Sequence, residues 1–137
     1  MRKHVRAEIA RQTGGMLRHG PPDQVVGTSK TFRQLARIAG AAPSDEGPYV
    51  TRILRHADVA ALAEKLPKMS QAERVKLPGV SASRVAQLPA GAVIADAILD
   101  LLGVDQIELC PWALREGVIL RRLDMLAQGL DSLLAGA

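Results

Sequence analysis

Aromatic residues are nearly missing from this chain of 137 residues, which has one Trp, one Tyr and one Phe. Proteins that bind single-stranded nucleic acids usually stack the bases on several aromatic side chains. Nucleic acid is therefore not expected as a partner on composition alone. The chain also has a single cysteine, Cys110, so an internal disulfide is impossible. This cysteine content is typical of a cytoplasmic protein.

Long apolar runs are missing as well. The most apolar stretch, residues 90–102, is interrupted by Asp96 and Asp100, whereas a membrane-spanning helix needs about 20 predominantly apolar residues. The sequence thus predicts no membrane span, and its first residues do not have the pattern of a signal peptide. Hydrophobic residues still make up 47% of the chain, which is enough for a globular domain with a core. A net charge of +4, carried mostly by arginine, favours phosphate-bearing partners.

One stretch has the pattern of a phosphate-binding turn. A β-branched pair at 25–26 reaches a glycine, then small hydroxyl residues and a lysine, and an apolar repeat of helical period follows over 32–39. A strand that turns into a helix N-terminus presents free backbone N–H groups and the positive end of the helix dipole to an anion. The hydroxyl residues can either cap the helix or bind a phosphate, so an ordinary capped turn fits the same pattern. The candidate phosphate-binding residues are Gly27, Thr28, Ser29, Lys30 and Thr31.

Hydrophobic periodicity predicts a helix-rich α/β domain with about five to six helices. Five segments have helical period between start and stop signals: residues 2–19, 32–39, 58–66, 83–102 and 113–127. Ser70–Glu73 has the pattern of a capping box that begins a further short helix. Strands are predicted at 25–26 and 106–110, while 49–55 fits either an edge strand or a helical lead-in. The two short strands should be parallel, and two are too few for a stable sheet, so the chain either borrows strands or belongs to something larger.

Residues 77–85 allow a different function. A Pro-Gly pair at 78–79 followed by small residues is similar to a helix-hairpin-helix motif, in which a Gly-rich hairpin presents backbone N–H groups to DNA phosphates. Ser81 stands where that motif usually has a second glycine. The other interpretation is that the Pro-Gly pair ends one helix and Ser81 caps the next.

Three blocks of sequence, taken in order, resemble a known family. They are residues 25–36, residues 77–81 with Arg84 and 90–92, and residues 113–118. Through these blocks the chain is similar to the C-terminal half of the exopolyphosphatase/guanosine pentaphosphate phosphohydrolase (Ppx/GppA) family. Its Ser-Lys-Thr and Cys-Pro-Trp variants resemble the actinobacterial branch.

The resemblance implies a partial ribonuclease H-like domain of the actin-like ATPase superfamily over residues 1–127, followed by a tail at 128–137. Family enzymes have two such domains across a cleft, and they remove terminal phosphate from inorganic polyphosphate or guanosine pentaphosphate with magnesium. Their catalytic Glu and metal-binding acids lie in the first domain. The resemblance therefore predicts no catalytic or metal-binding residue in this chain, which would form one wall of the cleft and be inactive alone. Its expected protein partner is the missing N-terminal half or a second copy.

Residues 27–31 correspond by position to the family's phosphate- or nucleotide-contacting loop. Ser29 and Lys30 replace glycines that are common in family members. A lysine at this position suits a polyanion better than a nucleoside, because it adds charge but fills space.

The resemblance also implies roles outside this loop. Arg84, which precedes the predicted core helix, and Arg115 correspond to family positions near the phosphate site. Arg115 and Glu116 match an Arg-Glu pair whose expected role is an ion pair that fixes the turn from strand to helix. Gly91 and Gly117 are expected to be structural residues near the site.

Three functions follow from the sequence. The chain is part of a phosphohydrolase, a non-catalytic module that binds polyphosphate or a nucleotide, or a helix-hairpin-helix DNA-binding domain. The residue pattern and the resemblance together favour the first.

Overall fold

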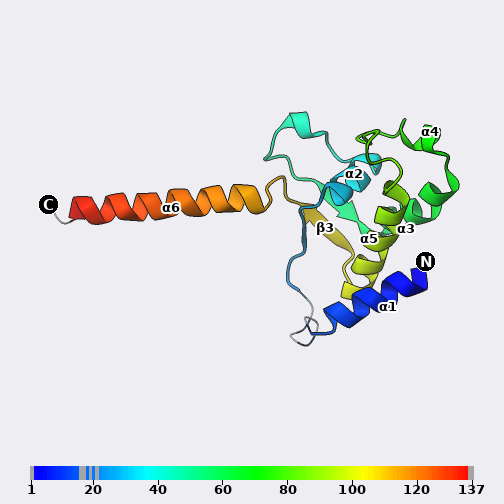
Figure 1. Ribbon diagram of the computed structural model, residues 1–137, viewed down its shortest axis with the longest axis horizontal. Coiled ribbons are helices and arrows are strands. Elements are labelled where there is room, and N and C mark those ends of the chain that lie inside the picture. The colour runs from blue at the N-terminus through cyan, green and yellow to red at the C-terminus, as the bar shows by residue number, and fades with distance from the viewer. Residues whose placement is uncertain (1, 16–17, 19, 21, 136–137) are drawn as a thin grey trace.

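The computed structural model describes residues 2–15, 18, 20 and 22–135 as a small α/β body with one long projecting helix (Figure 1). Residues 130–135 are described only as part of a helix. Three strands form the sheet: β1 (Val26–Gly27), β2 (Ile53–Arg55) and β3 (Gln106–Leu109). The helices are α1 (Arg2–Thr13), α2 (Lys30–Ile38), α3 (His56–Lys65), α4 (Gln71–Arg74), α5 (Leu88–Leu102) and α6 (Leu114–Ala135). Two 3₁₀ turns lie at Ser44–Glu46 and Leu66–Lys68.

The sheet has the strand order β1-β3-β2. β1 runs parallel to β3, with Val26 opposite Glu108, which confirms the two predicted parallel strands. β2 runs antiparallel to β3, with Leu54 opposite Ile107. Of the two interpretations of residues 49–55, the edge strand is therefore the correct one. β1 and β2 are the outer strands, and the exposed side chain of Val26 marks the β1 edge.

α5 is the central element of the core. It packs against α1, α2 and α3, and Ala92 and Leu99 on it are fully buried. Side chains on the polar edge of α5 also hold neighbouring elements, because Asp100 pairs with Arg6 of α1 and Asp96 Oδ1 lies 3.1 Å from His56 Nε2 at the start of α3. This arrangement confirms the central position that its apolar composition indicates. The same mixed, helix-rich architecture confirms the predicted partial ribonuclease H-like fold.

Three helix boundaries differ by more than two residues from those predicted. α1 ends at Thr13 because Gly14 and Gly15 form a turn, and glycine is costly inside a helix; residues 16, 17 and 19 of the predicted helix lie outside the described residues. α5 begins at Leu88 and not at 83, because residues 82–87 form turns and Pro89 occupies the first helical turn. Proline fits there since its missing N–H would have no helical partner. α6 continues past the predicted end at 127 to Ala135.

α6 extends away from the body, and the ribbon shows no other element beside most of its length (Figure 1). Large apolar side chains in the described part of α6 are consequently exposed. They are Leu114, Val118, Ile119, Leu120, Leu123, Met125 and Leu126. Even so, the described part of the chain contains no helix that is long and apolar enough to span a membrane. This many exposed apolar residues on one helix point to a missing neighbour.

The N-terminus of α2 lies against α5 at a glycine. A Cβ atom added to Gly91 would come within 2.7 Å of Thr31 Cγ2, too close for a normal contact. We expect Gly91→Ala to lower the free energy of unfolding by about 1 kcal/mol, because overpacking costs about 1–3 kcal/mol and the helix propensity of alanine recovers about 0.5–1 kcal/mol.

The matched test uses a Thr31→Ser background, which removes only the methyl group that Gly91 contacts. In that background we expect Gly91→Ala to raise the free energy of unfolding by about 0.5 kcal/mol, since only the propensity gain remains. Urea denaturation followed by circular dichroism measures all four proteins. An equal effect of Gly91→Ala in both backgrounds would show that Thr31 does not limit this contact.

Candidate functional site

The turn from β1 to α2 is built around a buried glycine and a helix cap. A Cβ atom at Gly27 would lie 2.9 Å from Ile107 Cδ1 and 3.4 Å from Phe32 Cβ, so a larger residue would have to displace the buried Ile107 side chain. Ser29 is the N-cap of α2, and its hydroxyl accepts a hydrogen bond from the Phe32 N–H at 3.2 Å. This contact confirms the capping role that the sequence left open for the hydroxyl residues.

A cavity of about 660 Å³ lies next to this turn. α2 forms one wall, the segment from Ala41 to Pro48 forms a second, and Gly79 and Ser81 form part of a third. Leu109 and Pro111 contribute the end of β3. The cavity is therefore at the carboxyl ends of the two parallel strands, where open α/β sheets commonly bind ligands.

Four cationic side chains line the cavity: Lys30, Arg33, Arg37 and Arg52. Three of them come from a single face of α2, since positions 30, 33 and 37 follow helical spacing. Arg33 Nη2 donates to the Thr28 carbonyl at 3.4 Å, and Arg37 Nη1 donates to the Ala41 carbonyl at 3.0 Å. Among the described residues, the lining contains no Asp or Glu to balance these charges. Such a cavity suits an anion.

Arg52 organises the second wall of the cavity. Its guanidinium donates to the Ala42, Pro43, Gly47 and Val50 carbonyls at 2.5–3.1 Å. These bonds gather the carbonyl groups of a loop that has little regular structure. Because all three guanidinium nitrogens are used in this way, Arg52 has a mainly structural role in the wall.

The third wall packs directly on α2. Gly79 has φ +75°, and a Cβ atom there would lie 2.6 Å from Arg37 Cγ. Gln34 Nε2 also donates to the Gly79 carbonyl at 3.4 Å. Glycine is needed here both for the left-handed backbone and for the close approach. The segment at residues 77–81 therefore supports the cationic face of α2.

The remaining predicted site residues lie in different places. Thr28, Ser29 and Lys30 are exposed beside the cavity, but of residues 27–31 only Lys30 lines it. The methyl group of Thr31 faces Gly91, which places the predicted structural glycine at the α2–α5 contact. Arg84 is exposed in the turns before α5 and is not part of the lining.

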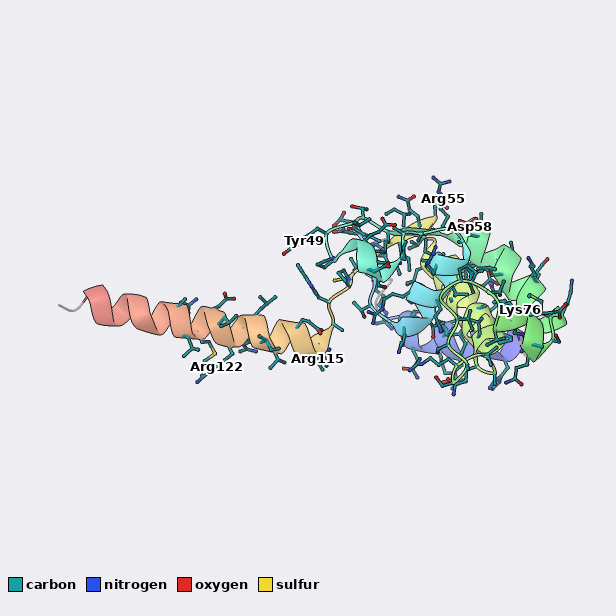
Figure 2. All side chains as sticks on the ribbon, turned by 90° about the horizontal axis from the view of Figure 1, so that it is seen from above. Tyr49, Arg55, Asp58, Lys76, Arg115 and Arg122 are labelled. Atoms are coloured by element: carbon teal, nitrogen blue, oxygen red, sulfur yellow. The ribbon has the colours of Figure 1, made fainter. Side chains whose placement is uncertain are left out.

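Arg115 and Glu116 form the predicted ion pair, with Arg115 Nη2 3.0 Å from Glu116 Oε1. Figure 2 shows Arg115 on the projecting helix α6; its side chain is 86% exposed and is not part of the cavity lining. Glu116 Oε2 accepts a hydrogen bond from the Ala113 N–H at 2.9 Å, which closes the first turn of α6. Gly117 lies in the same turn, and nothing within 4 Å would contact a Cβ atom there.

The carboxylate of Glu116 is stabilised in its charged form. The Ala113 N–H is the largest cause, followed by the Glu116 N–H and the Arg115 guanidinium, and together they lower the pKa of Glu116 from 4.5 to about 2. A carboxylate that accepts backbone N–H groups at a helix N-terminus is expected to behave in this way.

Several residues of the cavity were not identified from the sequence. Helical spacing places Arg33 and Arg37 on the same face as Lys30, so the sequence does contain a signal for both residues. Arg52 and Gly79 give no comparable signal in the sequence. The role of Arg52 depends on loop carbonyl groups, and the role of Gly79 depends on its contact with α2, which is far away in sequence. The capping box at Ser70–Glu73 is confirmed by both reciprocal hydrogen bonds, and these bonds from Ser70 lower the pKa of Glu73.

The cavity does not fit a magnesium ion. Mg²⁺ prefers carboxylate oxygen ligands, whereas this lining is cationic. No group of three or more His, Cys, Asp or Glu residues that could hold a metal exists within the described part of the chain.

The described structure also lacks the helical hairpin of the DNA-binding interpretation. α4 ends at Arg74, and the next helix begins only at Leu88, with turns at residues 82–87. Ser81 does not cap that helix, because its hydroxyl lies near Ser83 Oγ at 3.4 Å. Gly79 supports α2 and is not the tip of a helix-hairpin-helix motif.

Comparisons with known proteins define the class. The model of the Ppx/GppA phosphatase family matches residues 1–126, so the chain belongs to that family. The chain is 46% identical over 129 residues to Exopolyphosphatase 1 of Mycobacterium tuberculosis, which covers 94% of this chain and 38% of that protein. The matched region is the C-terminal part of the longer protein. The chain therefore spans well under half the length of this relative.

Two further relatives are more distant. Guanosine-5'-triphosphate,3'-diphosphate pyrophosphatase of Vibrio parahaemolyticus is 30% identical over 106 residues, which is 77% of this chain and 20% of that protein. An exopolyphosphatase structure from Cytophaga hutchinsonii superimposes with a TM-score of 0.73 at 21% identity, over 90% of this chain and 41% of the other. This likeness confirms the fold.

The low pKa of Glu116 gives a pH prediction. The pKa of Glu116 in the folded state is below its ordinary value of 4.5. The charged carboxylate therefore stabilises the folded chain fully above pH 4.5, and this contribution is lost as the pH falls through about 2. In an NMR titration we expect the Glu116 carboxyl and the Ala113 amide to change together with a midpoint near 2. Glu116→Gln should abolish the transition at the Ala113 amide. A midpoint near 4.5 would mean that Glu116 does not accept this hydrogen bond in solution.

Proposed function

We propose that this chain forms a phosphate-binding wall in a phosphohydrolase that removes terminal phosphate from inorganic polyphosphate or guanosine pentaphosphate. The observation that carries the proposal is the cationic cavity at the N-terminus of α2, in a chain of the Ppx/GppA family. Lys30 and Arg33 stand at the open end of α2, where the helix dipole also favours an anion. The names of the relatives support these two substrates.

The chain supplies binding groups, and we assign the chemistry to the rest of the protein. Catalytic carboxylates and magnesium ligands would come from an N-terminal portion that corresponds to the part of the relatives outside the match. Arg84 and Arg115 lie outside the cavity lining. In this proposal they would contact phosphate only where the N-terminal portion enlarges the site, or where a long polyphosphate reaches beyond the cavity. A cytoplasmic location, which the cysteine content favours, is part of the same proposal.

The surfaces that would receive the remaining portion are α6 and the β1 edge. The apolar residues of α6 up to Leu126 fall within the segment that matches the family. Exposed apolar residues that belong to a family domain are expected to be covered in the whole protein. The β1 edge can accept another strand, because one side of an outer strand has unpaired backbone groups.

The phosphate-binding wall is tested by charge-matched substitutions. We expect Lys30→Ala and Arg33→Ala each to weaken the binding of medium-length polyphosphate by about tenfold, since a charge-assisted hydrogen bond contributes about 1.5–3 kcal/mol. Lys76→Ala and Arg55→Ala are the controls, because both side chains are exposed elsewhere on the body (Figure 2). Calorimetric titration at two salt concentrations separates this site from diffuse charge attraction.

Three results would contradict the proposal. Equal losses from the cavity variants and their controls would mean that polyphosphate follows net charge only. Tighter binding to duplex DNA than to polyphosphate of equal charge would favour a nucleic-acid function. If the whole protein binds polyphosphate specifically but does not hydrolyse it, the non-catalytic binding module would be favoured.

The role of α6 predicts self-association of the isolated chain. Apolar side chains without their normal neighbour should bring copies together at high concentration. We expect sedimentation velocity to show a concentration-dependent dimer, and Ile119→Glu with Leu123→Glu to make the chain monomeric. Val75→Glu is the control, since Val75 is an exposed apolar residue of the body. A chain that stays monomeric at every concentration would show that this face does not bind protein.

A further inference from the structure

One face of the small sheet is open. Along β3 the side chains of Ile107 and Leu109 are buried in the core, so the alternation of the strand directs Glu108 to the opposite face. The strand register places Val26 of β1 and Ile53 of β2 on either side of Glu108. Val26 is 48% exposed, Ile53 is 37% exposed, and Glu108 is exposed as well. These three residues, the outer row, thus present an acidic side chain between two β-branched ones.

The outer row differs from an ordinary solvated sheet face. A sheet face that meets water usually carries polar side chains, whereas two of the three residues of the outer row are apolar. Within the described part of the chain, the Glu108 carboxylate forms no ion pair and accepts one long hydrogen bond, from Gln24 Nε2 at 3.4 Å. The row therefore fits a partner surface that is apolar and carries a cation.

The projecting helix α6 carries the matching pattern. Arg122 lies one helical turn from Val118 on one side and from Leu126 on the other, since residues four apart share a helix face. Both apolar neighbours are exposed. Figure 2 shows Arg122 on the part of α6 that lies beyond the body. A cation between two apolar residues on the helix thus corresponds to an acid between two apolar residues on the sheet.

The start of α6 is held from both sides. Before the helix, the Cys110 N–H donates to the Gly27 carbonyl at 3.0 Å, which fixes the end of β3. At the first turn of the helix, the Ala113 N–H donates to Glu116 Oε2 at 2.9 Å. Only two residues lie between these fixed points, so they set the direction in which α6 leaves the body.

These two residues, Pro111 and Trp112, are themselves constrained. The proline ring fixes φ at Pro111. The ring of Trp112 meets the ring of Tyr49 edge to face, with centroids 6.1 Å apart, and Tyr49 belongs to the loop before β2. From this connection α6 extends away from the body that contains its own sheet (Figure 1). The α6 helix of another copy is therefore the one that meets the outer row.

We propose that α6 of one copy covers the outer row of a second copy, with Arg122 paired to Glu108 of the partner subunit. This inference rests on the protein-binding role proposed for α6 and names the surface that receives the helix. Each copy has one such helix and one such row, so the contact forms twice and closes the dimer. Apolar contacts flank the charged pair, and the pair sets the position of the helix on the sheet.

The dimer contact and the cationic cavity use opposite faces of β3. Leu109 lines the cavity, and Glu108 points to the other side of the same strand. The proposed phosphate-binding wall and the proposed dimer contact can therefore be tested separately in the same chain.

Two charge reversals test the pair. We expect Glu108→Arg and Arg122→Glu each to raise the dimer dissociation constant about tenfold in sedimentation velocity, because each brings like charges together in the contact. An equal mixture of the two variants should form dimers as tight as those of the original chain. In that mixed dimer one contact has the original pair and the other has the reversed pair. A helix that folds back on its own sheet cannot produce this rescue.

The controls match each change of charge. Arg121→Glu makes the same change on α6, but about 100° around the helix from Arg122. Glu46→Arg makes the same change as Glu108→Arg at an exposed acid in the loop between α2 and β2. Both controls should leave the dissociation constant within about twofold. Circular dichroism checks that each variant is folded.

The possible failures separate this inference from the proposed function. A dimer that needs Ile119 and Leu123 but does not respond to Glu108→Arg would overturn this inference and leave the protein-binding role of α6 intact. Failure of the mixture to form dimers would also overturn it. A chain that is monomeric at every concentration would overturn both. The mixture should bind polyphosphate as tightly as the original chain, because neither substituted residue lines the cavity.

Discussion

The position of α2 depends on two places where a side chain is missing. At Gly27 the turn fits between Ile107 and Phe32, and at Gly91 the methyl group of Thr31 reaches the backbone of α5. Both contacts fix the first turn of α2, one from the sheet and one from the core helix. Because α2 begins at this point, its first-turn N–H groups and its cations are held at the carboxyl ends of β1 and β3. The close packing at Gly27 and Gly91 thus determines where the cations of the cavity lie.

The cations of the cavity divide between structure and binding. Four like charges in one cavity repel each other, and the repulsion is offset where a charge is surrounded by carbonyl groups. Arg52 has such a set of carbonyl partners, and Arg37 donates to Ala41 while its side-chain stem packs under Gly79. Lys30 and Arg33 are less committed to the protein, which makes them the groups that an incoming anion would neutralise. Arginine suits both roles because its planar guanidinium donates in several directions.

Local features of the sequence predicted much of the fold. The cap at Ser29, the capping box at Ser70–Glu73 and the parallel pairing of β1 with β3 all depend on residues close together or on simple periodicity, and all are observed. The start of α5 was missed because the apolar pattern continues through residues that form turns, and Pro89 marks the first helical turn and not a break.

The site was only partly predictable, for a physical reason. Lys30 belongs to a recognisable strand-turn-helix pattern, and its neighbours on α2 follow from helical spacing. The other walls are formed by a contact between distant residues, Gly79 with Arg37, and by the bonds of Arg52 to carbonyl groups of the loop before it. Such contacts depend on backbone geometry that no short motif specifies. The Tyr49–Trp112 contact has the same origin, because the two residues are far apart in sequence and meet only when β2 pairs with β3.

Two exposed apolar surfaces of the molecule differ in the partner that they can accept. The exposed apolar residues of α6 are aliphatic side chains and one methionine that lie along its length with charged residues between them, so another protein surface can cover them. The Tyr49–Trp112 surface is small, and the residues that precede both rings line the cationic cavity. In the proposed function, α6 would therefore contact protein and the cationic cavity would contact the ligand, and the turn where β3 leads into α6 lies between them.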